Sequence, residues 1–441
     1  MGLLFRGIVW FGLYLVLVLL PLVAALLGDP LPQARDIAVE TGVACGFIAF
    51  ALLVLEFALV SRLRAASEPF GTDALMQFHR LMGLGALAFL LAHPLLLVGH
   101  GASVASFDPL TTDWRQGTGA LAFWLLPVLV VTSVWRKRLR LRYERWRRLH
   151  SGAALVIVVA ALIHVLTRGH YARGWWLAGL LLFYGGLVLA LMLRYRVLRP
   201  LWLWSRAWRV VANRDEGGST RVLTLKPTGR AGIAFQPGQF AWLITGRTPF
   251  SAQQHPLSIA SSAERAHDGV LEFAVKALGD WSRTVPPALA PGTRVWVDGP
   301  YGAFTPDREP GQGFVLIAGG IGVAPMRSIL LTLRDREDAR PALLFFAARN
   351  WQRVTFRGEL AALERTMNLK VVYVFEEVPP GWNGERGHVT ADVLRRHLPR
   401  QYRRFQFFVC GPPPMMASLE AVLGALAVPA ANIHTERFDM V

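Results

Sequence analysis

Two stretches of the chain decide its fold: HRLMGLGALAFLLAH over residues 79–93 and HSGAALVIVVAALIH over residues 150–164. Each begins and ends with a histidine, fourteen residues apart, inside an apolar segment. On an α-helix such a step is almost four turns, so both histidines face one side, about 21 Å apart along the axis. Two such helices side by side would offer two histidine pairs across a hydrocarbon core about 30 Å thick.

These histidines are the candidate ligands of two b-type haems. A single histidine in a membrane often only bonds a helix carbonyl or lines a polar cavity. Intramembrane ionisable groups are costly and usually functional, so two equally spaced pairs favour ligation. The predicted metal ligands are His79, His93, His150 and His164. His100 and His170 lie outside this spacing and are expected to be decoys.

The composition of the 441-residue chain changes near residue 200. Before that point lie six apolar stretches, each close to the roughly 20 residues that cross a bilayer. They cover residues 3–27, 37–60, 75–98, 118–134, 151–167 and 175–193. We therefore predict an all-α bundle of six transmembrane helices as the first domain, residues 1–199.

The net charge of +17 indicates the orientation of this bundle. Eight basic residues lie between Arg136 and Arg148, with Glu144 as the one acid among them. By the positive-inside rule both termini are cytoplasmic and the third and fifth helices run outward, through the plasma membrane. His79 is then expected to pair with His150 on the inner side, and His93 with His164 on the outer side. Because topology explains the basic run, no nucleic-acid partner is expected.

After residue 200 the pattern becomes short β-rich runs punctuated by Gly and Pro, such as residues 221–225 and 239–244. This pattern predicts a small antiparallel β-barrel, assigned to residues 200–308. From about residue 313 strands alternate with glycine turns and helices, which predicts an α/β nucleotide-binding domain over residues 309–441. Its expected strands are residues 314–318, 342–347, 370–375 and 405–409.

Five motifs in this half occur in the order found in flavin reductases of the ferredoxin–NADP reductase type. They are His255-Pro256-Leu257-Ser258, Lys276 with Gly279-Asp280-Trp281-Ser282, Asp298-Gly299-Pro300-Tyr301-Gly302, Gly319-Gly320-Ile321-Gly322-Val323-Ala324-Pro325 and Cys410-Gly411-Pro412. With the four-histidine segment ahead of them, nearly the whole chain resembles the NADPH oxidase and ferric reductase superfamily. The resemblance implies FAD, two haem b groups and NADPH as cofactors, with NADH as the alternative nucleotide.

The resemblance also implies roles for single residues. Those expected along the flavin are His255, Pro256, Leu257 and Ser258, with the Ser258 hydroxyl near the flavin N5 edge. Those expected to hold the FAD pyrophosphate are Lys276, Gly279, Trp281 and Ser282. Those expected at the nicotinamide nucleotide are Gly319, Gly320, Gly322, Pro325, Cys410, Gly411 and Pro412. Each also has a structural interpretation: Pro256 and Gly279 as turn residues, Trp281 as core and Cys410 as a buried apolar side chain.

Three further expectations concern selectivity at this site. Leu257 stands where the family has phenylalanine, which conserves an apolar contact. Phe438, three residues before the end of the sequence, is the candidate aromatic cover of the flavin, and with Ser258 and Cys410 it completes the predicted catalytic set. Arg349 and Arg353 follow the second strand of the nucleotide domain and are expected to bind a 2′-phosphate, which favours NADPH.

The predicted activity is electron transfer from cytoplasmic NADPH through FAD and the two haems to an acceptor on the outer face. Oxygen, giving superoxide, is favoured because outward loops such as residues 101–117 hold no dense carboxylate, histidine or cysteine cluster. A ferric chelate and a separate partner protein are the alternative acceptors. No calcium-binding loop or regulatory insert is visible, so no obligatory cytosolic activator is expected.

Overall fold

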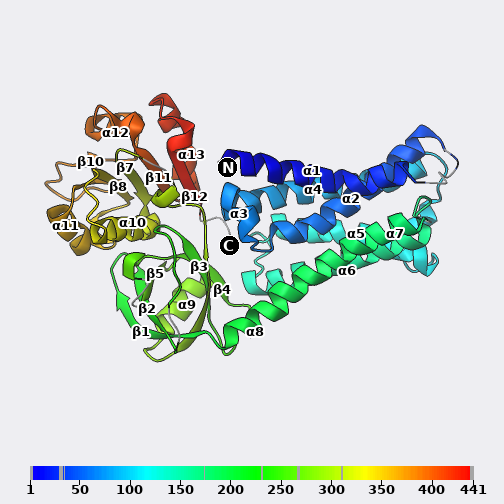
Figure 1. Cartoon of the computed structure of the whole chain (residues 1–441), viewed down its shortest axis with the longest axis horizontal. Helices are drawn as coiled ribbons and strands as arrows, with labels where there is room; N and C mark the ends of the chain where they lie inside the picture. The colour runs from blue at the N-terminus through cyan, green and yellow to red at the C-terminus, as the bar shows by residue number, and fades with distance from the viewer. Residues whose placement is uncertain are drawn as a thin grey trace. The chain divides into compact units, whose positions relative to one another are not determined.

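The structure is a computed structural model that describes residues 3–28, 33, 35–172, 174–229, 232–265, 269–308 and 311–437. Its contacts divide the chain into two compact units (Figure 1). The first, Met1–Phe70 with Ala74–Arg199, is helical, and the second, Gly71–Asp73 with Pro200–Val441, contains the β-sheets. The predicted fold class is confirmed: a helical bundle, an antiparallel sheet and a parallel sheet follow one another along the chain.

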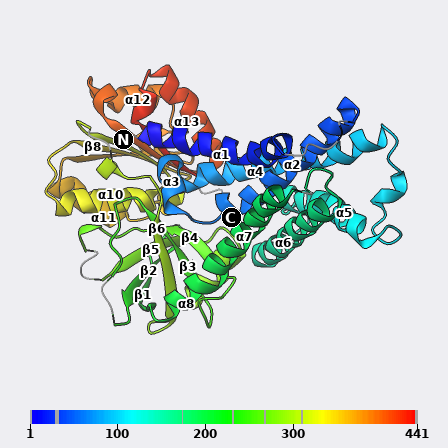
Figure 2. The ribbon, with the colours of Figure 1, turned by 45° about the vertical axis from the view of Figure 1, so that its right-hand side comes forward.

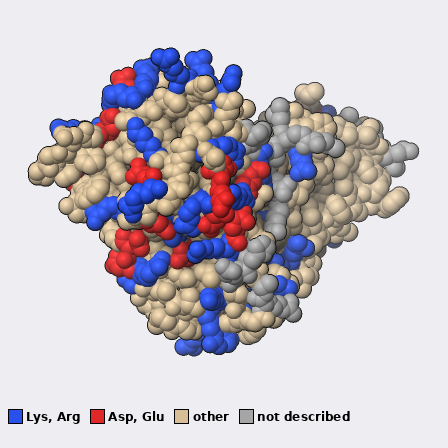
Figure 3. All heavy atoms as spheres, turned by 60° about the vertical axis from the view of Figure 1, so that its left-hand side comes forward, with Lys and Arg blue, Asp and Glu red and all other residues tan. Residues whose placement is uncertain are grey.

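Within the described residues, six helices are long and apolar enough to cross a membrane. They are α1 (Leu3–Leu26), α2 (Ile37–Leu59), α4 (Thr72–Val98), α5 (Trp114–Val134), α6 (Tyr143–Arg168) and α7 (Trp175–Leu193). Large apolar side chains on their outer surfaces are exposed, among them Ile8, Leu95 and Leu189. The bundle face visible in Figure 3 also carries few charged side chains. Such a surface suits contact with lipid rather than water.

The interior of the bundle is organised around α2. Its residues 49–56 are all buried, and α2 packs against α1, α6 and α7. Tyr184 of α7 is fully buried there, and its hydroxyl donates to the backbone oxygen of Leu17 at 2.5 Å. Short helices flank the spans: α3 (Arg64–Phe70) precedes α4, and α7 leads through a π-helical turn (Arg194–Leu198) into α8 (Arg199–Trp204).

The first sheet of the second unit is antiparallel and closes into a barrel. Its strands are β1 (Ala207–Asp215), β2 (Thr220–Pro227), β3 (Phe240–Ile244), β4 (Gln254–Ser258), β5 (Leu271–Lys276) and β6 (Arg294–Tyr301), in the order β4-β3-β6-β1-β2-β5. A bridge between Ile259 and Phe273 joins the two edge strands β4 and β5. The predicted antiparallel barrel is therefore confirmed, with one helix, α9 (Asp280–Ala288), after β5.

The second sheet is parallel, in the order β10-β9-β8-β7-β11-β12. Its strands are β7 (Phe314–Gly319), β8 (Ala342–Ala348), β9 (Leu369–Phe375), β10 (Glu385–Arg386), β11 (Gln406–Gly411) and β12 (Ile433–Arg437). Alternate residues of β7 point to opposite faces: Phe314 and Leu316 pack with α10 (Val323–Asp335) and α11 (Arg357–Thr366), whereas Val315 and Ile317 pack with α12 (Ala391–His397) and α13 (Pro413–Ala425). Figure 2 shows these two helical layers on either side of the sheet.

A buried ion network joins the barrel to the parallel-sheet domain. Arg327 of α10 is 5 % exposed, and its Nη1 lies 2.8 Å from Oε2 of Glu272 on β5 and 2.8 Å from the backbone oxygen of Ala260. Its Nε lies 2.5 Å from Oε2 of Glu359 on α11. Two carboxylates and a carbonyl therefore satisfy one buried guanidinium. Removal of this group would take the cation from Glu359 and leave Glu272 with the more exposed Arg214 alone.

We expect Arg327→Met to destabilise the second unit by roughly 3–5 kcal/mol, because a buried charge loses its partner. For a unit of this size that loss corresponds to a fall in Tm of about 10 °C. Thermal unfolding of the whole protein in detergent, followed by circular dichroism, measures it. The control is Arg395→Ala, which removes an exposed pair with Asp392 and should cost about 0–1 kcal/mol. Equal Tm values for the two variants would contradict the role of Arg327.

Candidate functional site

The four predicted ligand histidines form two pairs between α4 and α6. The ring centres of His79 and His150 lie 6.3 Å apart, with an angle of 74° between the ring planes. Those of His93 and His164 lie 6.4 Å apart, at 77°. We call His79 with His150 the proximal pair, because it lies at the bundle end where α7 leads into the second unit, and His93 with His164 the distal pair. The two sites have nearly the same geometry.

In each of the four rings the Nδ1 atom already has a partner. His93 Nδ1 lies 2.8 Å from the backbone oxygen of Gly42, and His164 Nδ1 lies 3.3 Å from that of Arg115. His150 Nδ1 lies 3.1 Å from Oγ of Ser133, whose hydroxyl donates to the backbone oxygen of Leu129 and so accepts from the ring. His79 Nδ1 contacts Oε2 of Glu56. An Nδ1–H fixed in this way leaves Nε2 as the lone-pair atom of each ring.

This arrangement fits a metal bound between the rings of each pair. Ring centres 6.3 and 6.4 Å apart are too distant for the two imidazoles to bond each other directly. Two nitrogens bonded to one metal at about 2 Å each would set their ring centres about 6 Å apart. Each pair could therefore hold one haem iron by two histidines. The Nδ1 atom of each ring already contacts a backbone or side-chain oxygen, as metal-bound histidines usually do.

Two glycines make room for the distal rings. A Cβ atom on Gly46 of α2 would lie 2.9 Å from Nδ1 of His93, and one on Gly119 of α5 would lie 2.5 Å from Nδ1 of His164. Sequence reasoning missed both glycines, since nothing in the local pattern says which glycine faces a histidine of another helix. It also missed Glu56, although this is the one acid between residues 41 and 60.

The predicted flavin segment is strand β4 of the barrel. Pro256 and Leu257 pair with Trp242 and Ala241 of β3, and Ser258 ends the strand in a buried position. The ring of His255 stacks on Trp281 with centres 4.0 Å apart and an angle of 21°. Trp281 is itself buried, and its Nε1–H donates to Oγ1 of Thr245 at 3.2 Å. Trp281 thus supports His255 from within the barrel.

The turn before α9 is closed by its own serine. Ser282 Oγ accepts the backbone N–H groups of Leu278 and Gly279, at 2.9 and 2.8 Å. The Lys276 ammonium lies 3.2 Å from the position that a Cβ atom would take on Gly320, so it lies beside the glycine turn that follows β7. Burial, followed by the nearby charge of Arg353, lowers the pKa of Lys276. An anion at this point would restore the charged form.

The two turns predicted for the nicotinamide nucleotide touch each other. They follow β7 and β11, which are neighbours in the parallel sheet, so both lie at its carboxyl edge. A Cβ atom on Gly322 would overlap the backbone oxygen of Cys410, and one on Gly319 would lie 2.7 Å from Cδ of Pro412. The first turn of α10, which contains the buried Pro325, begins directly after Gly322, and the Val323 N–H donates to the backbone oxygens of Gly320 and Ile321. The structure thus assembles Gly319, Gly320, Gly322, Gly411 and Pro412 at one place.

A buried carboxyl group that the sequence analysis missed lies at the same edge. Glu436 of β12 is opposite Cys410 of β11, and its Oε1 lies 3.5 Å from the position of a Cβ atom on Gly302. Burial raises the pKa of Glu436 to about 8, and the nearby hydroxyl of Ser258 counteracts part of that rise. Glu436 therefore holds a proton at neutral pH, beside the end of the predicted flavin strand.

The remaining predicted residues are Cys410 and, farther along the chain from these turns, Arg349, Arg353 and Phe438. Cys410 is fully buried in the core, and burial raises the pKa of its thiol well above the ordinary value. Arg349 is exposed and its Nε donates to Oε1 of Glu377 at 2.7 Å, whereas Arg353 donates to Oγ of Ser219 at 3.0 Å. The two arginines thus have separate partners. Phe438 lies outside the described residues.

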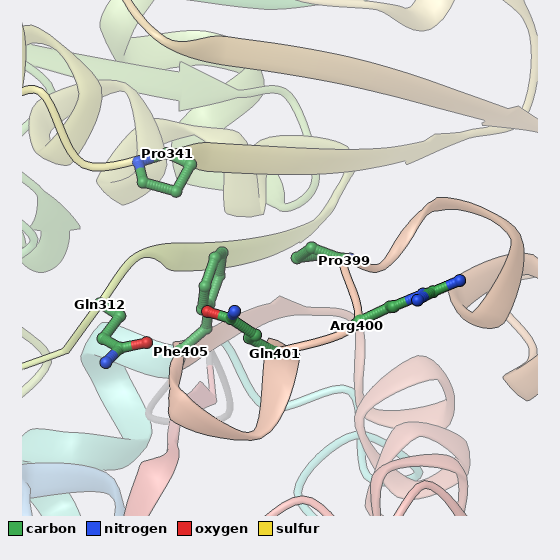
Figure 4. A pocket seen from close by; sticks show the side chains of 6 residues that line it. All are labelled: Gln312, Pro341, Pro399, Arg400, Gln401 and Phe405. Atoms are coloured by element: carbon green, nitrogen blue, oxygen red, sulfur yellow. The ribbon is translucent and has the colours of Figure 1, made fainter.

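A cavity of about 360 Å³ lies at the opposite edge of the parallel sheet (Figure 4). It is lined by residues that precede β7, β8 and β11, namely Gln312, Pro341, Pro399, Arg400, Gln401 and Phe405. Because nucleotides bind at the carboxyl ends of parallel strands, this cavity is not the nucleotide site.

Models of known protein families match the helical unit and each of the two sheets separately. Residues 45–161 match the ferric reductase-like transmembrane component, residues 218–305 an FAD-binding domain and residues 316–421 an oxidoreductase NAD-binding domain. The chain has the architecture of the NADPH oxidase and ferric reductase superfamily. Its second unit is the ferredoxin–NADP reductase-like module of that architecture, and its helical unit makes it a multi-pass membrane protein.

Individual relatives resemble part of this oxidoreductase. NADH-cytochrome b5 reductase 1 of Meyerozyma guilliermondii is 33 % identical over 34 % of this chain and 54 % of its own length. Ferredoxin–NADP reductase B of Sorangium cellulosum is 29 % identical over 52 % of this chain and 96 % of its own length. The structure of an Amycolatopsis cytochrome P450 reductase is 28 % identical, covers 53 % of this chain and 69 % of that chain, and has a TM-score of 0.46. The chain spans about half the length of the cytochrome b5 reductases it matches.

The pKa of Glu436 predicts a pH-dependent stability. Its folded-state pKa of about 8 exceeds the ordinary value of 4.5, so the folded protein binds this proton more tightly than the unfolded chain between those values. Stability therefore falls as pH rises through this window, by at most about 1.4 kcal/mol per pH unit. We expect Glu436→Gln to gain stability relative to the unmodified protein as pH rises from 5 to about 8.

Thermal unfolding of both proteins across this pH range measures the difference. Glu420→Gln is the control, since it removes an exposed carboxyl from neighbouring α13. Parallel pH profiles for Glu436→Gln and the unmodified protein would show that Glu436 does not hold the proton.

Proposed function

We propose that this protein transfers electrons from NAD(P)H across a membrane, with FAD bound in its second unit and two haems held by the proximal and distal pairs. The observation that carries the proposal is the matched geometry of those pairs, 6.3 and 6.4 Å between ring centres with every Nδ1 partnered. A nicotinamide gives two electrons together and a haem iron accepts one, so FAD supplies the conversion between them.

The residues of the second unit would bind and orient the two nucleotides. The Lys276 ammonium, which lies beside the turn at Gly320, would meet a phosphate there, and the turn at Gly279, closed by Ser282, would adjoin the FAD pyrophosphate. Ser258 and Glu436 would meet the reacting edge of the flavin, where the Glu436 carboxyl holds a proton at neutral pH. The adjoining turn at Cys410, Gly411 and Pro412 would border the nicotinamide. These roles rest on placement and on the family resemblance together.

The residues of the bundle would fix the ligands and exclude water. A haem iron held by both histidines of a pair would have no coordination position left for an external acceptor. Transfer to the acceptor would then be outer-sphere, which suits molecular oxygen and would yield superoxide.

A ferric chelate is the second candidate acceptor, because the matched transmembrane family is described as ferric reductase-like.

For the electron donor we propose NADPH, with NADH as the alternative. Arg349 is paired with Glu377, and this pair would have to open to admit a 2′-phosphate. We assign the domains as residues 1–199, 200–308 and 309–441, with both termini cytoplasmic.

The test is a spectrum of the purified protein in detergent, supplied with FAD and haem. NADPH is added without oxygen, and air is then admitted. Reduction of the Soret and α bands that reverses in air with superoxide formed supports the oxidase. Bands that stay reduced in air but reoxidise with ferric citrate support the ferric reductase instead. Absence of haem bands would overturn the haem assignment.

Gly119 gives a structural prediction for the distal site. Gly119→Ala adds a methyl group that displaces the His164 ring, so haem content should fall from about two per chain toward about one. Gly179→Ala on α7 is the matched control, because a Cβ atom there meets nothing within 4 Å. Absorbance of extracted haem per protein measures both. Full haem content in Gly119→Ala would argue against a ligand role for His164.

A further inference from the structure

Glu56 is a carboxylic acid in the buried centre of the bundle. It lies near the end of α2, 8 % exposed, in a run whose neighbours are apolar. An acid inside a membrane-spanning segment is costly unless it has a partner and a role. Its Oε2 contacts Nδ1 of His79, and within the described residues no group hydrogen-bonds its Oε1. The ion-pair contact that this side chain makes is therefore with a predicted haem ligand.

The partners of the other three ligand histidines are neutral. The distal rings of His93 and His164 donate to backbone carbonyl oxygens, and His150 donates to the Ser133 hydroxyl. The proximal site thus has the carboxyl group of an acid behind one of its ligands, and the distal site has none. A cation lies on the other side of the proximal site: Arg136 is 5.2 Å from the Trp146 ring, which is in turn 5.0 Å from the His150 ring. The Trp146 ring therefore separates the Arg136 guanidinium from the His150 ring.

A carboxylate that accepts the Nδ1–H of a ligand histidine makes the ring more basic and a stronger donor to its metal. Stronger donation and the negative charge both favour the more positive, oxidised state of a haem iron, and so lower its reduction potential. A carbonyl or hydroxyl partner has the same effect more weakly, because neutral hydrogen bonds are weaker than charge-assisted ones. The asymmetry of partners therefore predicts an asymmetry of potentials.

We infer that Glu56 is a positioning residue that orients His79 and makes the proximal haem the lower-potential one of the two. Electrons that enter at the proximal end would then move to the distal site downhill. The inference rests on the proposed function, because it concerns haems held by the two pairs. It goes beyond that function by naming the side chain that sets the direction of transfer.

The test is a spectroelectrochemical redox titration of the whole protein in detergent, comparing it with Glu56→Gln. Glutamine keeps the size and an acceptor oxygen but removes the charge. We expect the lower of two midpoint potentials to rise by at least about 59 mV, which is a tenfold change in the reduction equilibrium constant, and the upper one to move less. The His164→Ala variant, which lacks a distal ligand, should retain the lower midpoint and so assign it to the proximal pair.

The matched control is Glu40→Gln on the same helix. Glu40 accepts hydrogen bonds from Arg35 and Tyr171, and lies about 24 Å along α2 from Glu56. Removing its charge should leave both midpoints unchanged. A second variant, Ser133→Asp, places a carboxylate behind His150 instead, and should lower the proximal midpoint. It decides the question if Glu56→Gln fails to load haem.

The outcomes separate the inference from the function on which it rests. The inference would be overturned if the unmodified protein binds two haems but Glu56→Gln leaves both midpoint potentials unchanged. If Glu56→Gln binds no haem, unchanged midpoint potentials in Ser133→Asp would overturn it. Either result would leave the electron path intact. A shift of the distal midpoint alone would also overturn it. An unmodified protein without haem would instead contradict the proposed function.

Discussion

A polar side chain inside a membrane must find its partner within the protein, and this constraint governs the helical unit. Water is not available there, so every imidazole and carboxyl group among the spans needs a donor or acceptor from another helix. The four ligand rings meet it in three different ways, with backbone carbonyls for His93 and His164, a hydroxyl for His150 and a carboxylate for His79. Each contact also leaves Nε2 as the atom that can bind a metal. The demand for polar partners and the geometry of a metal site are thus met by the same bonds.

The second unit meets a different constraint, because its cofactors must reach the protein from water. Its sites lie at turns and strand ends rather than inside a core. Two neighbouring parallel strands, β7 and β11, end in glycine and proline turns that touch, since Gly322 leaves no room for a side chain against Cys410. The buried Arg327 network then fixes the barrel against this domain, so that Lys276 of the barrel lies beside Gly320 of the other sheet. Bringing together residues from two domains requires this rigid junction.

The periodicity of apolar residues was sufficient to predict the fold, because the pattern of buried and exposed positions in a helix or strand can be read from the sequence of that element alone. The apolar spans and the strands at residues 314–318, 342–347 and 370–375 differ from the observed elements by a few residues at each end. The ends of the helices were harder to predict. Helix α6 begins at Tyr143, eight residues before its apolar run, because a basic segment at a membrane surface can be helical without being apolar. The residues that support the ligands could not be predicted. Gly46, Gly119 and Glu56 matter only because of the helix that each one faces, and spacing within one helix does not contain that information.

Two buried acids show how one residue type serves opposite purposes in the two units. Glu436 has a hydroxyl group as its neighbour, and its burial raises the carboxyl pKa to about 8, so that at neutral pH it holds a proton beside the flavin strand. Glu56 faces the Nδ1–H of an imidazole, which is a donor, and a carboxylate is the form that such a donor favours. One acid therefore carries a proton at the place where a hydride donor and a flavin would react. The other acid would offer negative charge where single electrons would be held. The two acids differ because burial of Glu436 outweighs the effect of its neighbouring hydroxyl, whereas Glu56 contacts the imidazole of a ligand histidine.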